Sequence, residues 1–303
     1  MSRLLFIICF ILIDFSSSRE TDDVVRNQIA ELTSLAPVPI LEKGTAVVNV
    51  HFQNIGQSHC SNVQMKLTPL IAIETETHTA EIDAATATAS FTLQLEGTAK
   101  CTLCNAAIPT TTCIYLAPGE TIDIWCDMNE VVKRNKQLED KSSPILNVIP
   151  VTTNGHYAEV NNHDRVFRSA HTDIVTLYQR HNSGTFSSSA EAAASLVNDY
   201  LLMCSHIINT PGSKTQKALS IIELRLEAAH AAACAGKVTD ISDLERIFKV
   251  LDLNDTRLLL GHKAITTASV VYAYKDILPD CPLISYYETA LNRAMAKTAV
   301  QKL

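Results

Sequence analysis

The sequence predicts an α+β chain of two domains, an N-terminal β-sandwich followed by a C-terminal all-α helical bundle. Two patterns predict this order. In the first half, apolar and polar residues alternate over short stretches, as they do on strands that bury one face. From His163 onward, apolar residues recur at the spacing of helices. With 303 residues, the chain is long enough for each half to form its own core.

The first 18 residues have the composition of a secretory signal peptide. Arg3 precedes the apolar run 4–12, and serines up to Ser18 provide small residues for cleavage before Arg19. The run is far shorter than the roughly 20 residues that span a bilayer. We therefore expect a secreted, extracellular protein with no stable membrane span after cleavage. Residues 19–36 follow as an N-terminal leader, with a helix expected over 22–35.

The segment 37–162 carries the strand signals. The strongest stretch is 44–67, where two alternating runs flank a loop that contains Asn54 and Gly56. Pro118 and Gly119 form a turn signal before another alternating run. Together the pattern predicts strands at 38–41, 45–53, 62–70, 90–95, 121–127 and 145–151. Many short strands separated by turn residues are typical of a β-sandwich.

The order of these turns is also found in a known family. One strand ends in Asn54-Ile55-Gly56, Pro118-Gly119 precedes another, and Glu159-Val160-Asn161-Asn162 closes the segment. In this order, the segment from Pro37 to Asn162 resembles the cell-adhesion-related immunoglobulin-like modules called CARDB domains. The resemblance implies an immunoglobulin-like sandwich with an extracellular adhesion or spacer role, and it supplies no catalytic residues. Five cysteines and a charged insertion after Asp127 depart from the family.

Residues 163–303 contain about six candidate helices, each with one apolar face. Ser188 with Glu191, and Ser242 with Glu245, have the spacing of capping boxes. Gly236 is placed to end one helix, and proline ends another. The helices are expected over 164–180, 188–208, 214–235, from 242, over 256–277 and from 285. Helices with one apolar face must pack on one another, which predicts the bundle.

Cysteine usage agrees with export. The chain has nine cysteines, and Cys9 lies in the signal peptide. An even number in a secreted chain favours disulfides, although eight cysteines allow 105 pairings. The candidates are Cys60, Cys101, Cys104, Cys113, Cys126, Cys204, Cys234 and Cys281. A zinc site or a redox pair built on the Cys101 to Cys104 motif is the alternative. Asn254 begins the sequon that predicts a glycoprotein.

Histidines gather around the expected domain junction. A metal or hydrolytic site there would use His156, His163, His171 and Asp173, and the alternative is an exposed polar junction. The sequence contains no G-x-S-x-G elbow, no G-x-G-x-x-G and no phosphate loop. No cofactor is therefore predicted, and an enzyme is the less favoured class.

Charge and composition leave binding as the leading interpretation. The formal net charge is −7 and no basic patch stands out, so no nucleic acid is expected as a partner. We expect a secreted, non-enzymatic binding, adhesion or assembly protein that acts through protein–protein contacts, either with another protein or by self-association. The alternatives are a secreted hydrolase or metal-dependent enzyme with a site at the domain junction, and a carrier of an apolar ligand inside the helical bundle.

Overall fold

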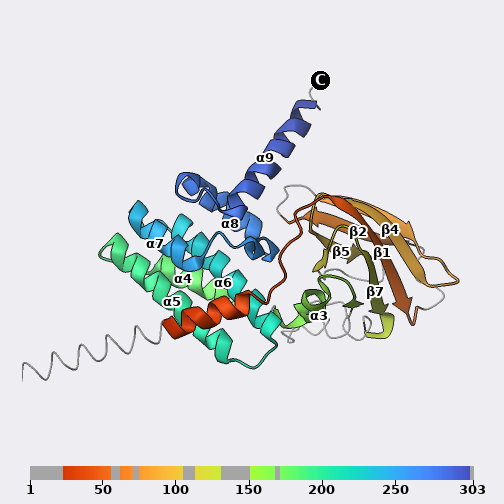
Figure 1. Ribbon diagram of the computed structural model, residues 1–303, viewed down its shortest axis with the longest axis horizontal. Helices are drawn as coiled ribbons and strands as arrows, with labels where there is room; N and C mark the ends of the chain where they lie inside the picture. Colours follow the sequence, from red (N-terminus) through yellow and green to blue (C-terminus); the bar gives the residue numbers. More distant parts are fainter. Residues whose placement is uncertain are drawn as a thin grey trace, which may run out of the picture. The chain divides into compact units, whose positions relative to one another are not determined.

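A computed structural model of the chain describes residues 23–55, 62–70, 75–104, 113–130, 151–167 and 171–300 (Figure 1). Within these ranges, the chain has an N-terminal β region of two four-stranded sheets and a C-terminal helical region. The order of strands before helices is the one that the sequence predicted. The proposed signal peptide, residues 1–18, lies outside the described residues.

The first sheet has the strand order β4-β1-β7-β8. Its central strand β1 pairs antiparallel with β4 and parallel with β7, so that Val48 lies opposite Phe91 on one side and Ile122 on the other. β8 completes the sheet by antiparallel pairing with β7. The bounds are β1 Gly44–Gln53, β4 Thr88–Leu95, β7 Thr121–Asp127 and β8 Val151–Thr153.

The second sheet has the order β3-β2-β5-β6 and is antiparallel throughout. Its strands are β2 Asn62–Pro69, β3 Glu76–Glu81, β5 Ala99–Cys104 and β6 Cys113–Leu116. The sequence predicts no strand at β5 or β6, because their cysteines are candidates for disulfides or a zinc site. In the structure Cys101 and Leu103 are alternate buried residues of β5, so the cysteine fills the place of an apolar core residue.

One hydrophobic cluster contains buried residues from both sheets. Along β1, the predicted alternation is confirmed, since Ala46, Val48, Val50 and Phe52 are buried while the residues between them are not. β2 contributes Val63, Met65 and Leu67 in the same way. Each Val, Leu, Phe or Met side chain among them stabilises the fold by about 1.5–3 kcal/mol when fully buried.

Helix α3, Ala158–Phe167, contacts an edge strand of each sheet, β8 in the first and β6 in the second. The buried Asn161 accepts from the Tyr115 backbone N–H at 2.8 Å and donates to its carbonyl at 3.1 Å. Asn162 makes the same two contacts with the backbone of Thr153, at 2.8 and 3.1 Å. Each asparagine side-chain amide thus makes the two hydrogen bonds that the backbone of a neighbouring strand would make. The residues that the resemblance placed at the close of the β region are therefore helical.

The strand predicted over 38–41 does not form. Ile40 instead exchanges hydrogen bonds with Thr98, donating to its hydroxyl at 2.8 Å and accepting from its backbone N–H at 2.7 Å. The Thr98 hydroxyl also contacts the buried Tyr157 hydroxyl at 2.6 Å. These contacts hold Ile40 in place without the regular ladder of a strand.

The helical region begins with α4, His171–Ser183, and continues with α5 Ser189–Asn209, α6 Lys214–Cys234 and α7 Ile241–Leu251. The Ser188 cap is confirmed, because its hydroxyl accepts from the Glu191 N–H at 3.2 Å. The Glu191 carboxylate accepts from the N–H of Ser187, one residue earlier than the capping box requires. α7 starts at Ile241, so Ser242 lies inside the helix and does not cap it.

The helix predicted over 256–277 is broken into three parts. They are η2 Thr256–Leu260, α8 Ala264–Val271 and η3 Tyr272–Ile277, and α9 Pro282–Val300 follows. Gly261 ends η2 in an extended conformation, and Tyr274 leaves helical backbone angles inside η3. The sequence predicts one helix here because the apolar residues keep a helical period across these breaks.

The chain forms two compact units, and they do not follow the boundary expected at His163. The first unites residues up to 36 with 173–251, and the second unites 37–172 with 252–303. In the second unit, Lys100 donates to the Gly261 carbonyl at 2.9 Å and the Tyr115 hydroxyl donates to the Leu260 carbonyl. In the first unit, a helix over residues 23–33 confirms the expected leader helix. The last helices therefore belong with the sheets, and the leader belongs with α4–α7.

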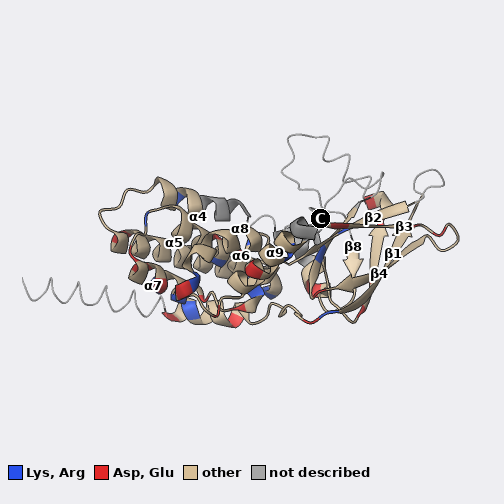
Figure 2. Ribbon diagram, turned by 90° about the horizontal axis from the view of Figure 1, so that it is seen from above, with Lys and Arg blue, Asp and Glu red and all other residues tan. Residues whose placement is uncertain are grey.

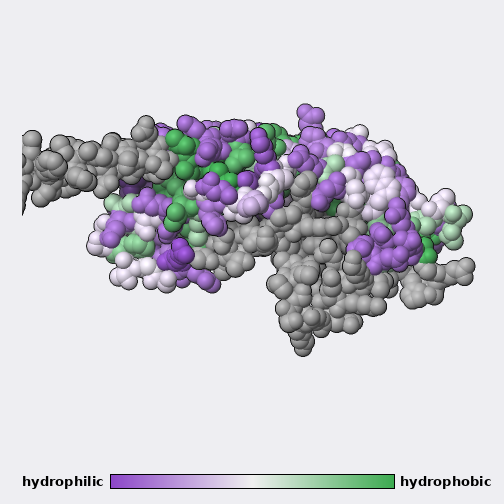
Figure 3. Space-filling model, turned by 90° about the horizontal axis from the view of Figure 1, so that it is seen from below, coloured by the Kyte–Doolittle hydropathy of each residue, from purple (hydrophilic) through white to green (hydrophobic). Residues whose placement is uncertain are grey.

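The surface of the first unit is mixed. Figure 2 shows acidic and basic residues interspersed over α5, α6 and α7. Figure 3 shows apolar areas interrupted by hydrophilic side chains on the helices, and the exposed large apolar residues of this unit include Val24, Leu35, Leu202 and Ile241. Among the described residues, no helix combines the length and the apolar character that a membrane crossing needs.

Candidate functional site

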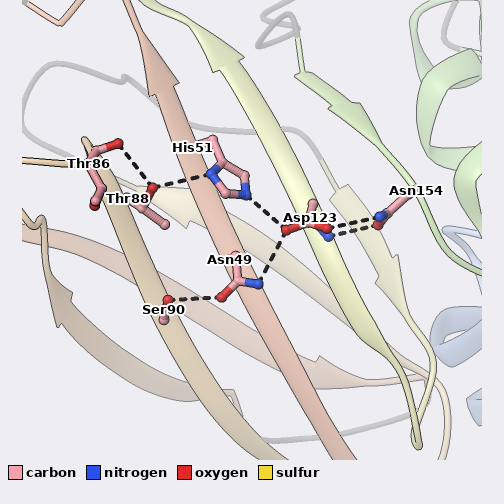
Figure 4. A network of polar contacts seen from close by, with 7 residues as sticks. All are labelled: Asn49, His51, Thr86, Thr88, Ser90, Asp123 and Asn154. Atoms are coloured by element: carbon pink, nitrogen blue, oxygen red, sulfur yellow. Dashed lines mark hydrogen bonds and ion pairs between the residues drawn. The ribbon is translucent and has the colours of Figure 1, made fainter.

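A connected set of polar side chains lies on the face of the first sheet opposite the core (Figure 4). Because β1 buries Val48 and Val50, its residues Asn49 and His51 point to the other face. β7 places Asp123 beside them through the parallel pairing of the two strands. We call this set the outer-sheet network; its members are Asn49, His51, Thr88, Ser90, Asp123 and Asn154.

Asp123 is the centre of the outer-sheet network. One of its carboxylate oxygens lies 2.8 Å from His51 Nε2 and accepts from Asn49 at 3.2 Å. The other accepts from the Asn154 amide at 3.0 Å. The hydrogen bond with His51 does most to lower the pKa of Asp123, burial opposes this, and the two asparagines lower it further. Asp123 is therefore a fixed anionic acceptor at neutral pH.

The other ring nitrogen of His51 extends the network to β4. His51 Nδ1 lies 3.2 Å from the Thr88 hydroxyl, which donates to the Thr86 carbonyl at 3.2 Å. In parallel, the Ser90 hydroxyl donates to the Asn49 side-chain carbonyl at 2.9 Å. Ala87, next to Thr88, has a positive φ of 53°; such a backbone costs about 1 kcal/mol or more for a residue with a Cβ. The network thus spans three strands, and Asn49, His51 and Asp123 each contact two or more of its other members.

An aromatic pair completes this face. The rings of His51 and Trp125 stack with centroids 5.7 Å apart and an interplanar angle of 18°. The side chains of His51 and Asp123 are 34% and 28% exposed, and Trp125 is half-buried. The face therefore presents an ordered aromatic surface next to ordered hydrogen-bonding groups, all of them within reach of a partner.

The order Thr88, His51, Asp123 matches that of hydroxyl–imidazole–carboxylate triads. In such triads the hydroxyl is aimed at the substrate. Here the Thr88 hydroxyl donates to the backbone carbonyl of Thr86, and Thr88 belongs to a regular strand. The geometry therefore suits a rigid recognition surface better than an activated nucleophile.

No family model matches the chain, and neither does any curated protein or solved structure.

The histidine site expected at the domain junction is described only in part. His156 is exposed; its backbone N–H donates to a Glu120 carboxylate oxygen at 3.0 Å, and its ring packs edge-on against Tyr157. The side chains of His163, His171 and Asp173 lie outside the described residues. Within the described residues, no three His, Cys, Asp or Glu side chains are grouped so that they could hold a metal ion.

Five of the eight candidate cysteines are free thiols, so the disulfides expected for them are absent. The five are Cys101, Cys126, Cys204, Cys234 and Cys281. Cys60 and the side chains of Cys104 and Cys113 lie outside the described residues. Cys101 and Cys126 are buried core residues, and burial raises the pKa of Cys126 to about 12, which disfavours the thiolate that zinc would need.

The glycosylation candidate Asn254 is exposed, in a turn just before η2. The following residue, Asp255, caps η2 by accepting from the Arg257 N–H at 3.0 Å. The position is thus open to the solvent, as an attached glycan requires.

Sequence reasoning did not find the outer-sheet network, although part of the signal was available. Asn49 and His51 alternate with buried residues of β1, and Asp123 and Trp125 do so on β7. These positions are polar or amphipathic and lie on the solvent side of the alternation. What the sequence could not supply was the parallel pairing of β1 with β7, which joins residues more than 70 positions apart.

Proposed function

We propose that this chain is a secreted, non-enzymatic binding protein that acts through protein–protein contacts made by the outer face of the sheet β4-β1-β7-β8. The observation that carries the proposal is the outer-sheet network beside Trp125. These groups are ordered on the side of the sheet away from the core, so they are already in place when a partner arrives. Preorganised side chains lose little entropy on binding, and tryptophan is among the residues that contribute most to protein interfaces.

The same proposal includes the finer architecture. An immunoglobulin-like sandwich of the CARDB kind, followed by a helical bundle, is supported by the order of the turns and by the apolar cluster to which both sheets contribute. Secretion is supported by the composition of residues 1–18 and by the exposed sequon at Asn254. In a secreted adhesion or assembly protein, an outward sheet face is a ready contact surface.

The test is site-specific photo-crosslinking of the full chain, secreted by cells of its source. A photoreactive benzoylphenylalanine replaces Trp125, and a control chain carries it at Thr79, an exposed residue of β3 in the other sheet. We expect an adduct with one defined protein at position 125 and none at position 79. The adduct mass distinguishes a second copy of this chain from another protein. Equal labelling at both positions, or none at position 125, would contradict the proposal.

A hydrolase is the second candidate, and the order Thr88, His51, Asp123 favours it. If the triad were catalytic, His51→Ala and Thr88→Ala would each reduce hydrolysis of p-nitrophenyl acetate by a hundredfold or more. The binding proposal expects the two variants to match the parent chain. An apolar-ligand carrier gains no comparable support, because α6 buries Glu223, Arg225 and Glu227 inside the helical unit.

A further inference from the structure

A thiol, an imidazole and a phenol meet in the helical unit. Cys234 is the last residue of α6, and its sulfur lies 3.4 Å from Nε2 of His230, one helical turn earlier. The same sulfur lies 3.6 Å from the hydroxyl of Tyr178 on α4. The Tyr178 and His230 rings pack edge to face at 5.4 Å, so each of the three side chains contacts the other two.

Exposure separates Cys234 from the other described thiols. Cys101, Cys126, Cys204 and Cys281 are buried, whereas Cys234 is exposed. Burial raises the pKa of Cys126 and of Cys204 to about 12 and also raises that of Cys281. Those three remain protonated thiols at neutral pH and are shielded from reagents. Among the described cysteines, only Cys234 offers both access and a base in contact.

We propose that Cys234 is a thiol–disulfide exchange site that takes up low-molecular-weight disulfides of the glutathione class. The thiol proton passes to Nε2 of His230, and the Tyr178 hydroxyl donates a hydrogen bond to the resulting thiolate. The thiolate attacks one sulfur of the disulfide, whose S–S bond breaks as the new one forms. The departing thiolate takes a proton from the imidazolium. The added disulfide supplies the oxidising equivalents, and the product is a mixed disulfide at Cys234.

In this proposal Cys234, His230 and Tyr178 act together on the same sulfur. Thiolates are the nucleophiles in disulfide exchange, and a nearby imidazole increases the thiolate fraction. A phenol that donates to the sulfur stabilises the same anion. The contact with Cys234 is the main cause that raises the pKa of Tyr178, which keeps this donor protonated. The site lies in the helical unit, whereas the outer-sheet network belongs to the other unit.

The experiment uses the reduced, desalted full chain with oxidised glutathione at pH 7, followed by peptide mapping. We expect the glutathione adduct at Cys234 at least tenfold faster than at any of the four buried cysteines. His230→Gln should slow labelling of Cys234 about tenfold, whereas His206→Gln, a matched change at an exposed residue of α5, should leave it unchanged. Added imidazole should restore part of the rate in His230→Gln.

A denatured control separates the cluster from the thiol alone. In guanidinium chloride, the parent chain and His230→Gln should label Cys234 at equal rates, because unfolding separates the thiol from its neighbours on the folded surface. The proposal is overturned if His230→Gln labels the folded chain as fast as the parent does. It is also overturned if the buried cysteines react as fast as Cys234 in the folded chain.

Discussion

Two adjacent asparagines complete the edge strands of the β region. Asn161 pairs with the backbone of Tyr115 on β6, and Asn162 pairs with that of Thr153 on β8. An amide can do this because it offers one donor and one acceptor side by side, as a peptide group does. Edge strands otherwise present unpaired backbone groups that invite aggregation. Sequence reasoning placed this pair at the end of the β region but could not assign the role.

The change Asn161→Asp tests this role. A carboxylate keeps the acceptor for the Tyr115 N–H but loses the donor, and it brings negative charge to the Tyr115 carbonyl in a buried place. We expect the free energy of unfolding to fall by about 2–4 kcal/mol. Urea denaturation measures it. Asn292→Asp, the same change at an exposed residue of α9, should cost less than about 0.5 kcal/mol; similar losses for both variants would refute the strand-like role of Asn161.

His181 provides a pH-dependent contribution to stability. It is 2% exposed beside Phe186, and its Nε2 has no hydrogen-bond partner among the described residues. Burial is the main cause that lowers its pKa; Lys237 acts in the same direction and Asp199 in the opposite one. The folded state thus prefers the neutral ring. Stability is complete above the unfolded pKa of about 6.5 and is lost as the pH falls below it.

We therefore expect His181→Leu to flatten the pH dependence of unfolding. Between pH 7 and pH 5 the parent chain should lose stability by on the order of 1 kcal/mol more than this variant does. Thermal or urea unfolding at the two pH values gives the comparison. His206→Gln, at an exposed position, should keep the parent's slope. A His181→Leu chain with the full parental slope would show that another group carries the effect.

At the scale of elements, the sequence predicted the strands and helices whose own residues show the full pattern of buried and exposed positions. β1, β2, β4 and β7 show the alternation directly, and α5 and α6 have clear caps. β5 was missed because Cys101 stands at one of its buried positions, and β6 was missed because it is only four residues long. The prediction of one helix over 256–277 was wrong, because the local backbone geometry at Gly261 and Tyr274 interrupts it. The outer-sheet network depends on strand pairing, which a linear pattern does not contain.

Helix α6 is the central element of the first unit. It buries the charged residues Glu223, Arg225 and Glu227 along with its apolar ones, and the Arg225 guanidinium donates to the Thr33 hydroxyl at 3.3 Å. Thr33 and Ile29 are the buried residues of the helix over 23–33. Arg225 therefore attaches the leader helix to the unit through a polar contact.

Replacing Arg225 by Met should destabilise the helical unit by about 1–3 kcal/mol, because the buried hydrogen bond from its guanidinium to the Thr33 hydroxyl is lost. The matched change Arg246→Met, at a mostly exposed residue that pairs with Asp243, should cost about 0–1 kcal/mol. Chemical denaturation followed by circular dichroism compares the two. The leader should also become more sensitive to protease in Arg225→Met. Equal stability of the two variants would remove Arg225 from this role.

At the scale of the whole molecule, each of the two units is formed by two segments that are separate in the sequence. The segment 252–303 packs with the sheets, although the sequence assigned it to the helical domain. Sequence period distinguishes helices from strands but does not show on which element a helix packs. Three contacts attach this segment to the sheets: Lys100 donates to the Gly261 carbonyl, Tyr115 donates to the Leu260 carbonyl, and Arg293 pairs with Glu96 at 3.0 Å.

Tyr115→Phe should loosen η2 without affecting the first unit. The variant keeps the ring but leaves the Leu260 carbonyl without the phenol that now donates to it. Hydrogen exchange by mass spectrometry should show faster exchange in residues 256–261, while residues 189–251 keep the parental rates. Faster exchange throughout 189–251 as well would contradict the assignment of η2 to the β-containing unit.

The most direct measurement of the central claim is the affinity of the full chain for the protein captured at position 125, compared between the parent and Trp125→Ala. If the outer face of the sheet is the binding surface, the variant should bind at least tenfold more weakly, a loss of about 1.4 kcal/mol or more. Thr79→Ala, at an exposed residue of β3, should bind like the parent. Unchanged affinity of a folded Trp125→Ala chain would contradict the account.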